Sequence, residues 1–394
     1  MNTPEVSVIV TNYNGAQHLH ACFSSLGRLN YPSEKLEVIM VDDASTDDSV
    51  EFMRKQFPQI GIVVNPRNLR FTRTVIAGVK ATSAPLMAFL NNDTRVEPDW
   101  LIELVRPFES DPKCAATSAK MLEWDGSRVN FGGGYLNFEG RGFEICSGRT
   151  PGAESSEGQP TFFACGGGMA TRREIYEAVG GFDGDFRMTY EDVDYGWRLN
   201  LLGYNVMFCP RALMYHRSHA WLSTVTYPVR ASFLDRNAYQ MLFKNLSDEN
   251  LSRLLTPALL LSWRRGKALQ DQPFRDFLDS AGPLKRNMVG LIRRMLKAID
   301  QRLDINSTDL RAHTDAMDGF LNELPRLIPK REWIQANRQV PDDRIFERFF
   351  PHPFRTWAYN DDHYRYLAAA GYDHTKDLMV KIWNLAELFR SVES

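Results

Sequence analysis

The ten residues VSVIVTNYNG at positions 6–15 decide the fold class, because a short β-branched apolar run ends there in a polar turn. Helix-compatible sequence follows to about Leu26. The same order returns with apolar runs at 36–41, 60–64 and 85–90, each followed by a polar loop and a helix-compatible stretch. Continuous apolar strands joined by crossover helices form a mainly parallel sheet that helices cover on both faces. We therefore predict an α/β, Rossmann-like fold for the first half of the chain.

Polar side chains at the strand ends predict where the ligand site lies. Ligands of such sheets bind beyond the carboxyl ends of the strands. Asp42 and Asp43 follow the second strand, where a carboxylate can accept hydrogen bonds from a ribose or a base. The alternative is a helix-capping loop, in which Ser45 or Thr46 caps a helix to about residue 57. No GxGxxG follows the first strand, which argues against a dinucleotide site.

The fourth strand ends at Asn91-Asn92-Asp93. A divalent ion that bridges two phosphates needs few protein carboxylates, because the phosphates and water supply the other oxygen ligands. Asp93 is the carboxylate available at this strand end. An ordinary turn is the alternative.

A dense acidic cluster consists of Glu191, Asp192 and Asp194, shortly after a Gly-Gly-Phe-Asp turn. A carboxylate among like charges has a raised proton affinity, which suits a general base near neutral pH. The alternative is a favourable placement of acids in the first turn of a helix. His216 ends the next strand-like run, and by itself it indicates a structural histidine.

Length and composition limit the class of protein. A chain of 394 residues suits two domains, and 43% apolar residues are enough for buried cores. The net charge of −2 argues against nucleic acid as the partner. The apolar runs are far shorter than the ~20 residues of a membrane-spanning helix, and the first residues lack signal-peptide features. Five scattered cysteines without CxxC indicate thiols in a reducing cytoplasm. We expect a cytoplasmic protein.

The pattern changes twice along the chain. A glycine-rich stretch at 125–159 predicts a β excursion or a lid. Alternating elements return with a helix at 172–179 and a strand at 205–209, and after about residue 219 the sequence reads as helical. Helices are expected at 229–246, 249–265, 283–303, 308–324 and 376–390. We set domains at 1–220 and 221–394, the second all-α.

The joint order of these motifs resembles a known family. The matching stretches are VSVIVTNYN (6–14), VDDASTD (41–47), FLNNDT (89–94), GGGMATRR (166–173), GGFD (180–183), YEDVD (190–194), WR (197–198), LGY (202–204) and YH (215–216). The chain resembles the inverting glycosyltransferases of family 2, which have the GT-A fold, and among them bacterial rhamnosyltransferase-like enzymes of surface polysaccharides. The resemblance covers residues 5–219.

The resemblance implies roles for individual residues in binding the donor, a nucleoside-diphosphate sugar. The nucleotide would contact Thr11, Asn12, Tyr13, Asp42, Asp43, Asn68, Arg70 and Asn92. Asp93 and His216 would hold Mg²⁺ or Mn²⁺ on the diphosphate. Asn91 departs from the family pattern, because an acid usually stands there, and the departure leaves one carboxylate for the metal.

The resemblance also implies the catalytic step. Asp192 would take the proton of a hydroxyl on a saccharide or lipid-linked acceptor, and the sugar would be transferred with inversion. The sugar and the acceptor would contact Gly166, Gly167, Gly168, Glu191, Trp197 and Arg198. For Trp197 a core position is equally compatible with the sequence.

Residues 283–303 form a separate feature of the helical half. Apolar residues recur there at helical spacing, and six basic residues face one acidic residue. Such a helix can lie on the inner face of a membrane, where a lipid-linked acceptor would be found. A helix packed on its neighbours with a solvated basic face is the alternative. For the whole chain the alternative function is a catalytically silent nucleotide-sugar-binding scaffold, which Asn91 favours.

Overall fold

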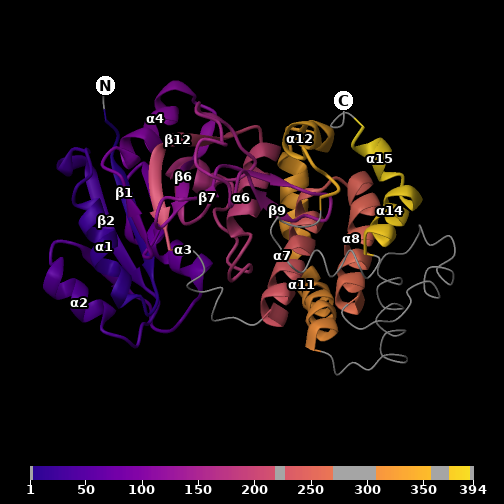
Figure 1. The fold of residues 1–394 in the computed structure, drawn as a ribbon, viewed down its shortest axis with the longest axis horizontal. Coiled ribbons are helices and arrows are strands. Elements are labelled where there is room, and N and C mark those ends of the chain that lie inside the picture. The colour runs from indigo at the N-terminus through magenta and orange to yellow at the C-terminus, as the bar shows by residue number, and fades with distance from the viewer. Residues whose placement is uncertain (1–2, 218–226, 269–307, 356–371, 391–394) are drawn as a thin grey trace. The chain divides into compact units, whose positions relative to one another are not determined.

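The computed structural model of the chain describes residues 3–217, 227–268, 308–355 and 372–390 and divides it into two compact units (Figure 1). The first unit consists of Met1–Tyr135 and Gly142–Ala220, and the second of Leu136–Arg141 and Trp221–Ser394. The sequence placed one boundary at residue 220. It gave no sign that the hexapeptide Leu136–Arg141 belongs with the helical half.

Four parallel strands form the N-terminal part of the sheet in the first unit. They are β1 (Val6–Asn12), β2 (Leu36–Asp42), β3 (Gly61–Val64) and β4 (Leu86–Asn91), and β1 pairs with both β2 and β4. The crossover helices are α1 (Ala16–Leu26), α2 (Ser49–Gln56) and α3 (Phe71–Ala81). This confirms the predicted α/β class.

Burial explains why the first strand reads as a continuous apolar run. All seven residues of β1 are buried, so both of its faces are covered. On one face Ile9 packs in a core with Val41, Val75 and Phe89. Alternation along a strand turns Val8 and Val10 to the opposite face, where they are buried as well.

The remaining strands make the sheet mixed. The order is β10-β12-β6-β11-β4-β1-β2-β3, and β11 (Gly168–Arg172) runs antiparallel between β4 and β6 (Cys114–Glu123). β12 (Asn205–His216) runs parallel to β6 and also pairs with β5 (Thr94–Val96). Helices α4 (Trp100–Ser110), α5 (Arg173–Ala178) and α6 (Glu191–Leu201) complete the unit.

The glycine-rich stretch is a β excursion, one of the two predicted possibilities. It contains β7 (Val129–Phe131), β8 (Gly134–Leu136), β9 (Gly142–Glu144) and β10 (Gln159–Pro160). β8 and β9 form a separate two-stranded sheet.

The predicted cap of α2 by Ser45 or Thr46 is wrong. Ser45 does not cap α2, because its N–H and hydroxyl both donate to Asp42. Thr46 does not cap it either, since α2 begins at Ser49, whose N–H donates to Asp47 over 3.1 Å.

The described parts of the second unit are helical, as predicted. The helices are α7 (Tyr227–Asn245), α8 (Asp248–Ala268), α11 (Thr308–Asn337), α12 (Asp342–Phe349), α14 (Tyr372–Ile382) and α15 (Leu385–Leu388). α12 was not predicted. The basic stretch 283–303 lies outside the described residues. None of the helices in the described ranges combines the length and apolar character that crossing a membrane requires.

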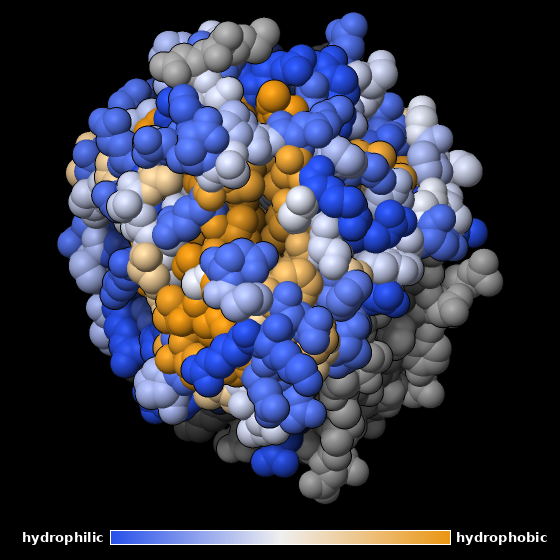
Figure 2. All heavy atoms as spheres, turned by 90° about the vertical axis from the view of Figure 1, so that its left-hand side faces the viewer, coloured by the Kyte–Doolittle hydropathy of each residue, from blue (hydrophilic) through white to orange (hydrophobic). Residues whose placement is uncertain are grey.

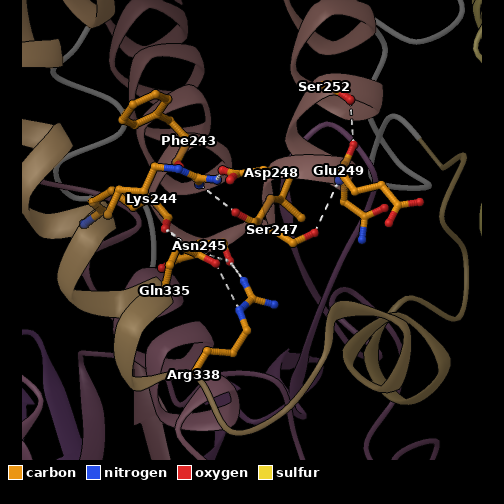
Figure 3. A network of polar contacts seen from close by, with 12 residues as sticks. Phe243, Lys244, Asn245, Ser247, Asp248, Glu249, Ser252, Gln335 and Arg338 are labelled. Atoms are coloured by element: carbon orange, nitrogen blue, oxygen red, sulfur yellow. Dashed lines mark hydrogen bonds and ion pairs between the residues drawn. The ribbon is translucent and has the colours of Figure 1, made fainter.

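Helix α11 continues past Pro325, where the prediction ended it at residue 324. Figure 3 shows part of what its last turns contact, namely the end of α7 and the turn into α8. Gln335 donates to the carbonyl oxygen of Lys244 over 3.0 Å, and Arg331 donates to that of Leu246 over 2.6 Å. The last carbonyls of a helix have no partner within it, so these side chains cap α7. Tertiary contacts thus stabilise α11 beyond its prolines.

A buried group of charges joins the hexapeptide Leu136–Arg141 to the helices of the second unit. Asp235 is almost wholly buried and pairs with Arg141, with Arg265 at 3.5 Å and with His313 at 2.5 Å. Arg265 also pairs with Glu139. Buried charges are tolerated when each has a partner, and here the hexapeptide supplies one acid and one base.

Apolar surface lies on the side of the first unit that carries α1, α2 and β2. Figure 2 shows this surface as a strip between hydrophilic residues. β3 is one of the two edge strands of the sheet, and 49% of the surface of Val64 in it is exposed.

Candidate active site

The register of the sheet brings three strand ends together. Thr11 pairs with Asn91 of β4, and Asn12 pairs with Asp42 of β2. The backbone N–H of Asn65, just after β3, donates to the carbonyl oxygen of Asp42 over 2.8 Å. The polar residues that the sequence placed after separate strands therefore lie along one edge.

Asn12 links the loops at this edge. Its Nδ2 donates to Asp42 over 2.7 Å and to the hydroxyl of Ser45 over 3.2 Å, and its Oδ1 accepts from Asn92 over 2.5 Å. Asp42 has no exposed surface, and it also accepts from the N–H and hydroxyl of Ser45. The prediction that Asp42 contacts the nucleotide is therefore wrong, since its carboxylate braces the loop from inside.

Asp43 positions the loop that contains Asn68 and Arg70. Its Oδ1 accepts from Asn65 and from the N–H of Leu69, both over 2.8 Å. Its Oδ2 accepts from the N–H of Arg70 over 2.9 Å. Asn68 accepts from the same N–H over 3.1 Å. Asp43 itself is 3% exposed, so the structure shows it as a residue that holds this loop, and its contact with a base stays a prediction.

The residues around this edge include exposed side chains and strained backbone. Tyr13 is 50% exposed, and Arg70 is exposed as well. Asn14, Ala44 and Arg70 have φ angles of 49°, 59° and 69°. Non-glycine residues with positive φ are uncommon and concentrate at functional sites. Three of them at neighbouring loops support a binding site here.

His216 lies beside Asp93, because β12 pairs with β5 at its end. The Nε2 of His216 is 3.2 Å from Oδ1 of Asp93, and its Nδ1 is 3.3 Å from Oδ1 of Asn130. Asn130 donates in turn to Glu123 over 3.1 Å. Burial acts to lower the pKa of His216, but the hydrogen bond and charge of Asp93 raise it above its usual value. Burial likewise opposes the lowered pKa of Asp93, which His216 produces.

The pair of Asp93 and His216 fits part of a metal site. A carboxylate oxygen and an imidazole nitrogen 3.2 Å apart match two neighbouring ligand positions of Mg²⁺ or Mn²⁺. Asn130 provides the outer hydrogen bond that orients a metal-binding imidazole. In the described ranges no group of three or more His, Cys, Asp and Glu side chains is arranged to hold a metal ion. Phosphate and water oxygens would supply the other ligands.

Asp192 stands in the first turn of α6 with both carboxylate oxygens bound. Oδ2 accepts from the N–H of Gly166 over 2.9 Å, and Oδ1 accepts from the N–H of Val193 over 2.8 Å. Burial raises the pKa of Asp192 above the usual aspartate value, although these donors oppose the rise. The residue keeps a partly exposed surface. It is thus a basic carboxylate within reach of a bound molecule.

Glu191 has a different environment from its neighbour. It is 5% exposed, and its Oε2 lies 3.4 Å from the hydroxyl of Thr72. Burial, and then the charge of Asp192, raise the pKa of Glu191. The side chain of Glu191 is enclosed, and its contact with the sugar stays a prediction.

The glycine segment connects Asp192 with the metal-site loop. Gly166 binds Asp192, and the carbonyl oxygen of Gly167 accepts from the N–H of Asn91 over 3.2 Å. A Cβ at Gly167 would lie 2.7 Å from Nδ2 of Asn91. Gly168 is different, since a Cβ there would lie 2.3 Å from Sδ of Met214 in the core. Gly168 is a packing residue, and its predicted contact with the sugar is wrong.

Two further sugar-site predictions are wrong. Trp197 has no exposed surface and packs edge-on against Phe162, with ring centroids 5.7 Å apart. Arg198 is 5% exposed, and its guanidinium binds Asp194 at 2.9 Å and two backbone carbonyls at 2.6 Å. Both residues hold α6 in place, which is the core alternative that the sequence left open for Trp197.

The sequence did not single out several residues that lie close to these groups. They are His18, Thr72, Glu123, Asn130 and Glu144. His18 acts electrostatically on Asp93, and Glu144 on both Asp192 and His216. His18 and Thr72 stand in helices, Glu123 and Asn130 in strands, and Glu144 ends a strand of only three residues. The alternation of Gly142, Phe143 and Glu144 along this strand was the one local signal for the side to which the Glu144 side chain points.

Comparison with known proteins identifies the first unit. The model of Glycosyl transferase family 2 matches residues 7–180. The O-antigen biosynthesis protein RfbC of Myxococcus xanthus is 29% identical over 247 residues, which are 60% of this chain and 19% of that protein. An uncharacterized glycosyltransferase of Haemophilus influenzae is 32% identical over 118 residues, which are 29% of this chain and 36% of that protein. The chain thus spans well under half the length of these relatives.

A solved structure shows the same fold. Crystalline GalNAc-T7 with UDP, GalNAc and Mn²⁺ superposes with a TM-score of 0.55 and 17% sequence identity, over 70% of this chain and 54% of that one. Residues 7–180 of this chain therefore form a glycosyl transferase family 2 domain, and the fold is that of the GT-A glycosyltransferases.

Proposed function

We propose that this chain is an inverting glycosyltransferase that moves a sugar from a nucleoside-diphosphate sugar to a hydroxyl of a saccharide or lipid-linked acceptor in bacterial surface-glycan synthesis. The observation that carries the proposal is the bridge from Asp192 through Gly166 and Gly167 to the loop of Asp93. It supports the proposal because it links the proposed base to the proposed metal ligands Asp93 and His216. The family match and the name of the Myxococcus relative support it.

In the proposed mechanism Asp192 is the general base. It accepts the proton of the acceptor hydroxyl, whose oxygen attacks the anomeric carbon of the donor sugar. The new carbon–oxygen bond forms on one face while the bond to the β-phosphate oxygen breaks on the other. The nucleoside diphosphate leaves with that electron pair, and the configuration inverts. The raised pKa of Asp192 makes it a stronger base than an exposed aspartate.

Asp93 and His216 would hold Mg²⁺ or Mn²⁺ on the diphosphate. When bound, the ion neutralises the charge that develops on the leaving phosphate. The GalNAc-T7 structure contains UDP and Mn²⁺, which supports a divalent ion in this fold. Asn130 keeps the imidazole of His216 turned towards Asp93.

The nucleoside would lie over the exposed loops at the other strand ends. Tyr13 offers a half-exposed ring, and Arg70 an exposed guanidinium. Thr11, Asn12, Asn68 and Asn92 shape the loops beneath. In this arrangement Asp43 sets the position of Arg70 through its backbone N–H.

One observation favours the second candidate, a silent scaffold that binds a nucleotide sugar. Asn91 stands where the family carries an acid, and its buried Oδ1 meets no hydrogen-bond partner among the described residues. The metal site then relies on a single carboxylate. The glycosyltransferase and the silent scaffold would both bind the donor, but only the glycosyltransferase would transfer the sugar.

Isothermal titration of the purified chain with UDP, dTDP and GDP, each with and without Mn²⁺, tests both candidate functions. We expect one nucleotide to bind and Mn²⁺ to tighten its binding. Asp93→Asn should remove the Mn²⁺ effect, whereas Asp99→Asn, an exposed aspartate at the start of α4, should not. A folded protein that binds none of the three nucleotides contradicts the proposal. Binding without transfer to any acceptor favours the scaffold.

A further inference from the structure

The strand β9 packs against the first turn of α6, where Asp192 stands. A Cβ at Gly142 would lie 3.2 Å from Cγ2 of Val193 and 3.6 Å from Cε1 of Tyr190. These two residues flank the Glu191-Asp192 pair. The start of β9 is thus in direct contact with the segment that carries the proposed base.

The alternation of the strand turns Glu144 to the same side. Phe143 points to the opposite face, where its ring stacks on Tyr135 with centroids 5.3 Å apart and planes 16° apart. Side chains at i and i+2 share a face of a strand. Glu144 therefore extends from the face of β9 that Gly142 packs on α6.

The electrostatics of the neighbours agree with this position. Desolvation raises the pKa of Glu144 to about 7, opposed by a hydrogen bond from Ser147 and increased by the charge of Asp192, with His216 and Glu123 also acting on it. The pKa of the Cys165 thiol is raised by burial and by Asp192, Glu144 and Glu191. Glu144 nevertheless keeps an exposed surface. The side chain of Glu144 is thus accessible to a bound molecule.

We propose that Glu144 binds the acceptor, by accepting a hydrogen bond from a hydroxyl next to the one that Asp192 deprotonates. The inference rests on the proposed function and adds the residue that orients the acceptor. Glu144 comes from the β excursion, and Asp192 from α6, so an acceptor that contacts both residues is held between two elements. A carboxylate accepts hydrogen bonds from sugar hydroxyls, and charged hydrogen bonds are the stronger ones.

The test compares Glu144→Gln with Glu157→Gln, an exposed glutamate of the same excursion. The acceptor probes are p-nitrophenyl glycosides of hexoses and 6-deoxyhexoses, used with the donor whose nucleotide binds in the titration. For Glu144→Gln we expect the acceptor KM to rise about tenfold or more, because a charged hydrogen bond is lost. Donor affinity and the slow transfer to water should stay within about twofold of the wild type. Glu157→Gln should match the wild type in every measurement, and Glu144→Asp should regain part of the acceptor affinity.

The outcomes separate the two proposals. An unchanged acceptor KM in Glu144→Gln overturns the role of Glu144 and leaves the glycosyltransferase proposal intact. A loss of kcat and of transfer to water at unchanged KM also overturns it, because Glu144 would then act on the reacting atoms. A wild-type chain that transfers to none of the probes and to no water counts against the glycosyltransferase proposal itself, and the role of Glu144 fails with it.

Discussion

The backbone N–H of Gly166 donates a 2.9 Å hydrogen bond to Oδ2 of Asp192. This bond connects the turn before β11 with the first turn of α6, so the sheet fixes the direction of the carboxylate. The helix N-terminus favours its negative charge, while burial disfavours it. The balance leaves Asp192 ionisable and more basic than a surface aspartate.

Replacing Asp192 by Asn should remove transfer while the donor still binds. The amide has nearly the same shape but cannot accept the proton, and general-base catalysis contributes about 10²–10⁴-fold to such reactions. The measurements are kcat with the best acceptor probe and nucleotide affinity by titration. Asp48→Asn, an exposed aspartate at the start of α2, is the control. Turnover within a few fold of the wild type would rule out Asp192 as the base.

The pH dependence of kcat/KM should show the raised pKa of Asp192. The base works only when ionised, so the rate should fall as the pH drops through its pKa. Because burial raises that pKa, the acid limb should lie above the ~3.9 of an unperturbed aspartate. A profile that stays level down to about pH 4 would contradict the raised value.

Replacing Asn130 by Ala should weaken the metal site without touching a proposed ligand. The ring of His216 loses its Nδ1 partner, and loss of such outer hydrogen bonds typically costs about 10–100-fold in metal affinity. The measurement is the Mn²⁺ concentration that gives half the increase in nucleotide affinity. Asn337→Ala in α11 serves as the control. An unchanged Mn²⁺ requirement would show that the orientation of His216 does not matter.

Gly15→Ala should disrupt the linked strand ends. The added Cβ would lie 1.9 Å from Nδ2 of Asn92 and 2.6 Å from Oδ1 of Asn12, so the hydrogen bond between them must break. We expect nucleotide affinity to fall about tenfold or more, since the loops beneath the nucleotide shift. Gly27→Ala is the matched control, because the nearest atom to its added Cβ would lie 3.6 Å away, which is an ordinary van der Waals contact. Equal affinity in the two variants would argue against this bracing.

Asp235→Asn should destabilise the second unit. Although burial opposes it, Arg141, Arg265 and His313 hold the pKa of Asp235 far below its usual range. Its stabilising contribution is therefore full above the unfolded-state pKa of ~3.9 and is lost as the pH falls towards the native pKa. Removing one partner of a buried charge group costs about 3–5 kcal/mol, which urea unfolding followed by circular dichroism can measure at pH 7. Asp315→Asn, exposed on α11, should unfold like the wild type.

The sequence predicted the strand ends because strands and their polar termini are local patterns. The apolar runs around Val8 and Leu90 are buried strands, as predicted. In the structure the register of β1 and β2 then places Asn12 beside Asp42. The order of the motifs predicted the family, which the comparisons confirm.

The sequence could not separate residues that face the site from those that face the core. Asp42 and Trp197 stand in motifs that match the family, yet neither has exposed surface. The guanidinium of Arg198 donates its hydrogen bonds to backbone carbonyls. Exposure depends on which element covers a side chain, and that is decided by contacts far apart in the sequence. Glu144 was missed for the same reason, since its position depends on β9 meeting α6.

The hexapeptide Leu136–Arg141 limits how the helical half of this protein can be exchanged in a chimera. A crossover at residue 220 that exchanged only the helical half would pair Glu139 and Arg141 with a sequence that lacks Asp235 and Arg265. A chimera made at that point would carry unmatched charges inside its new half. A graft of the helical half should therefore bring the hexapeptide with it.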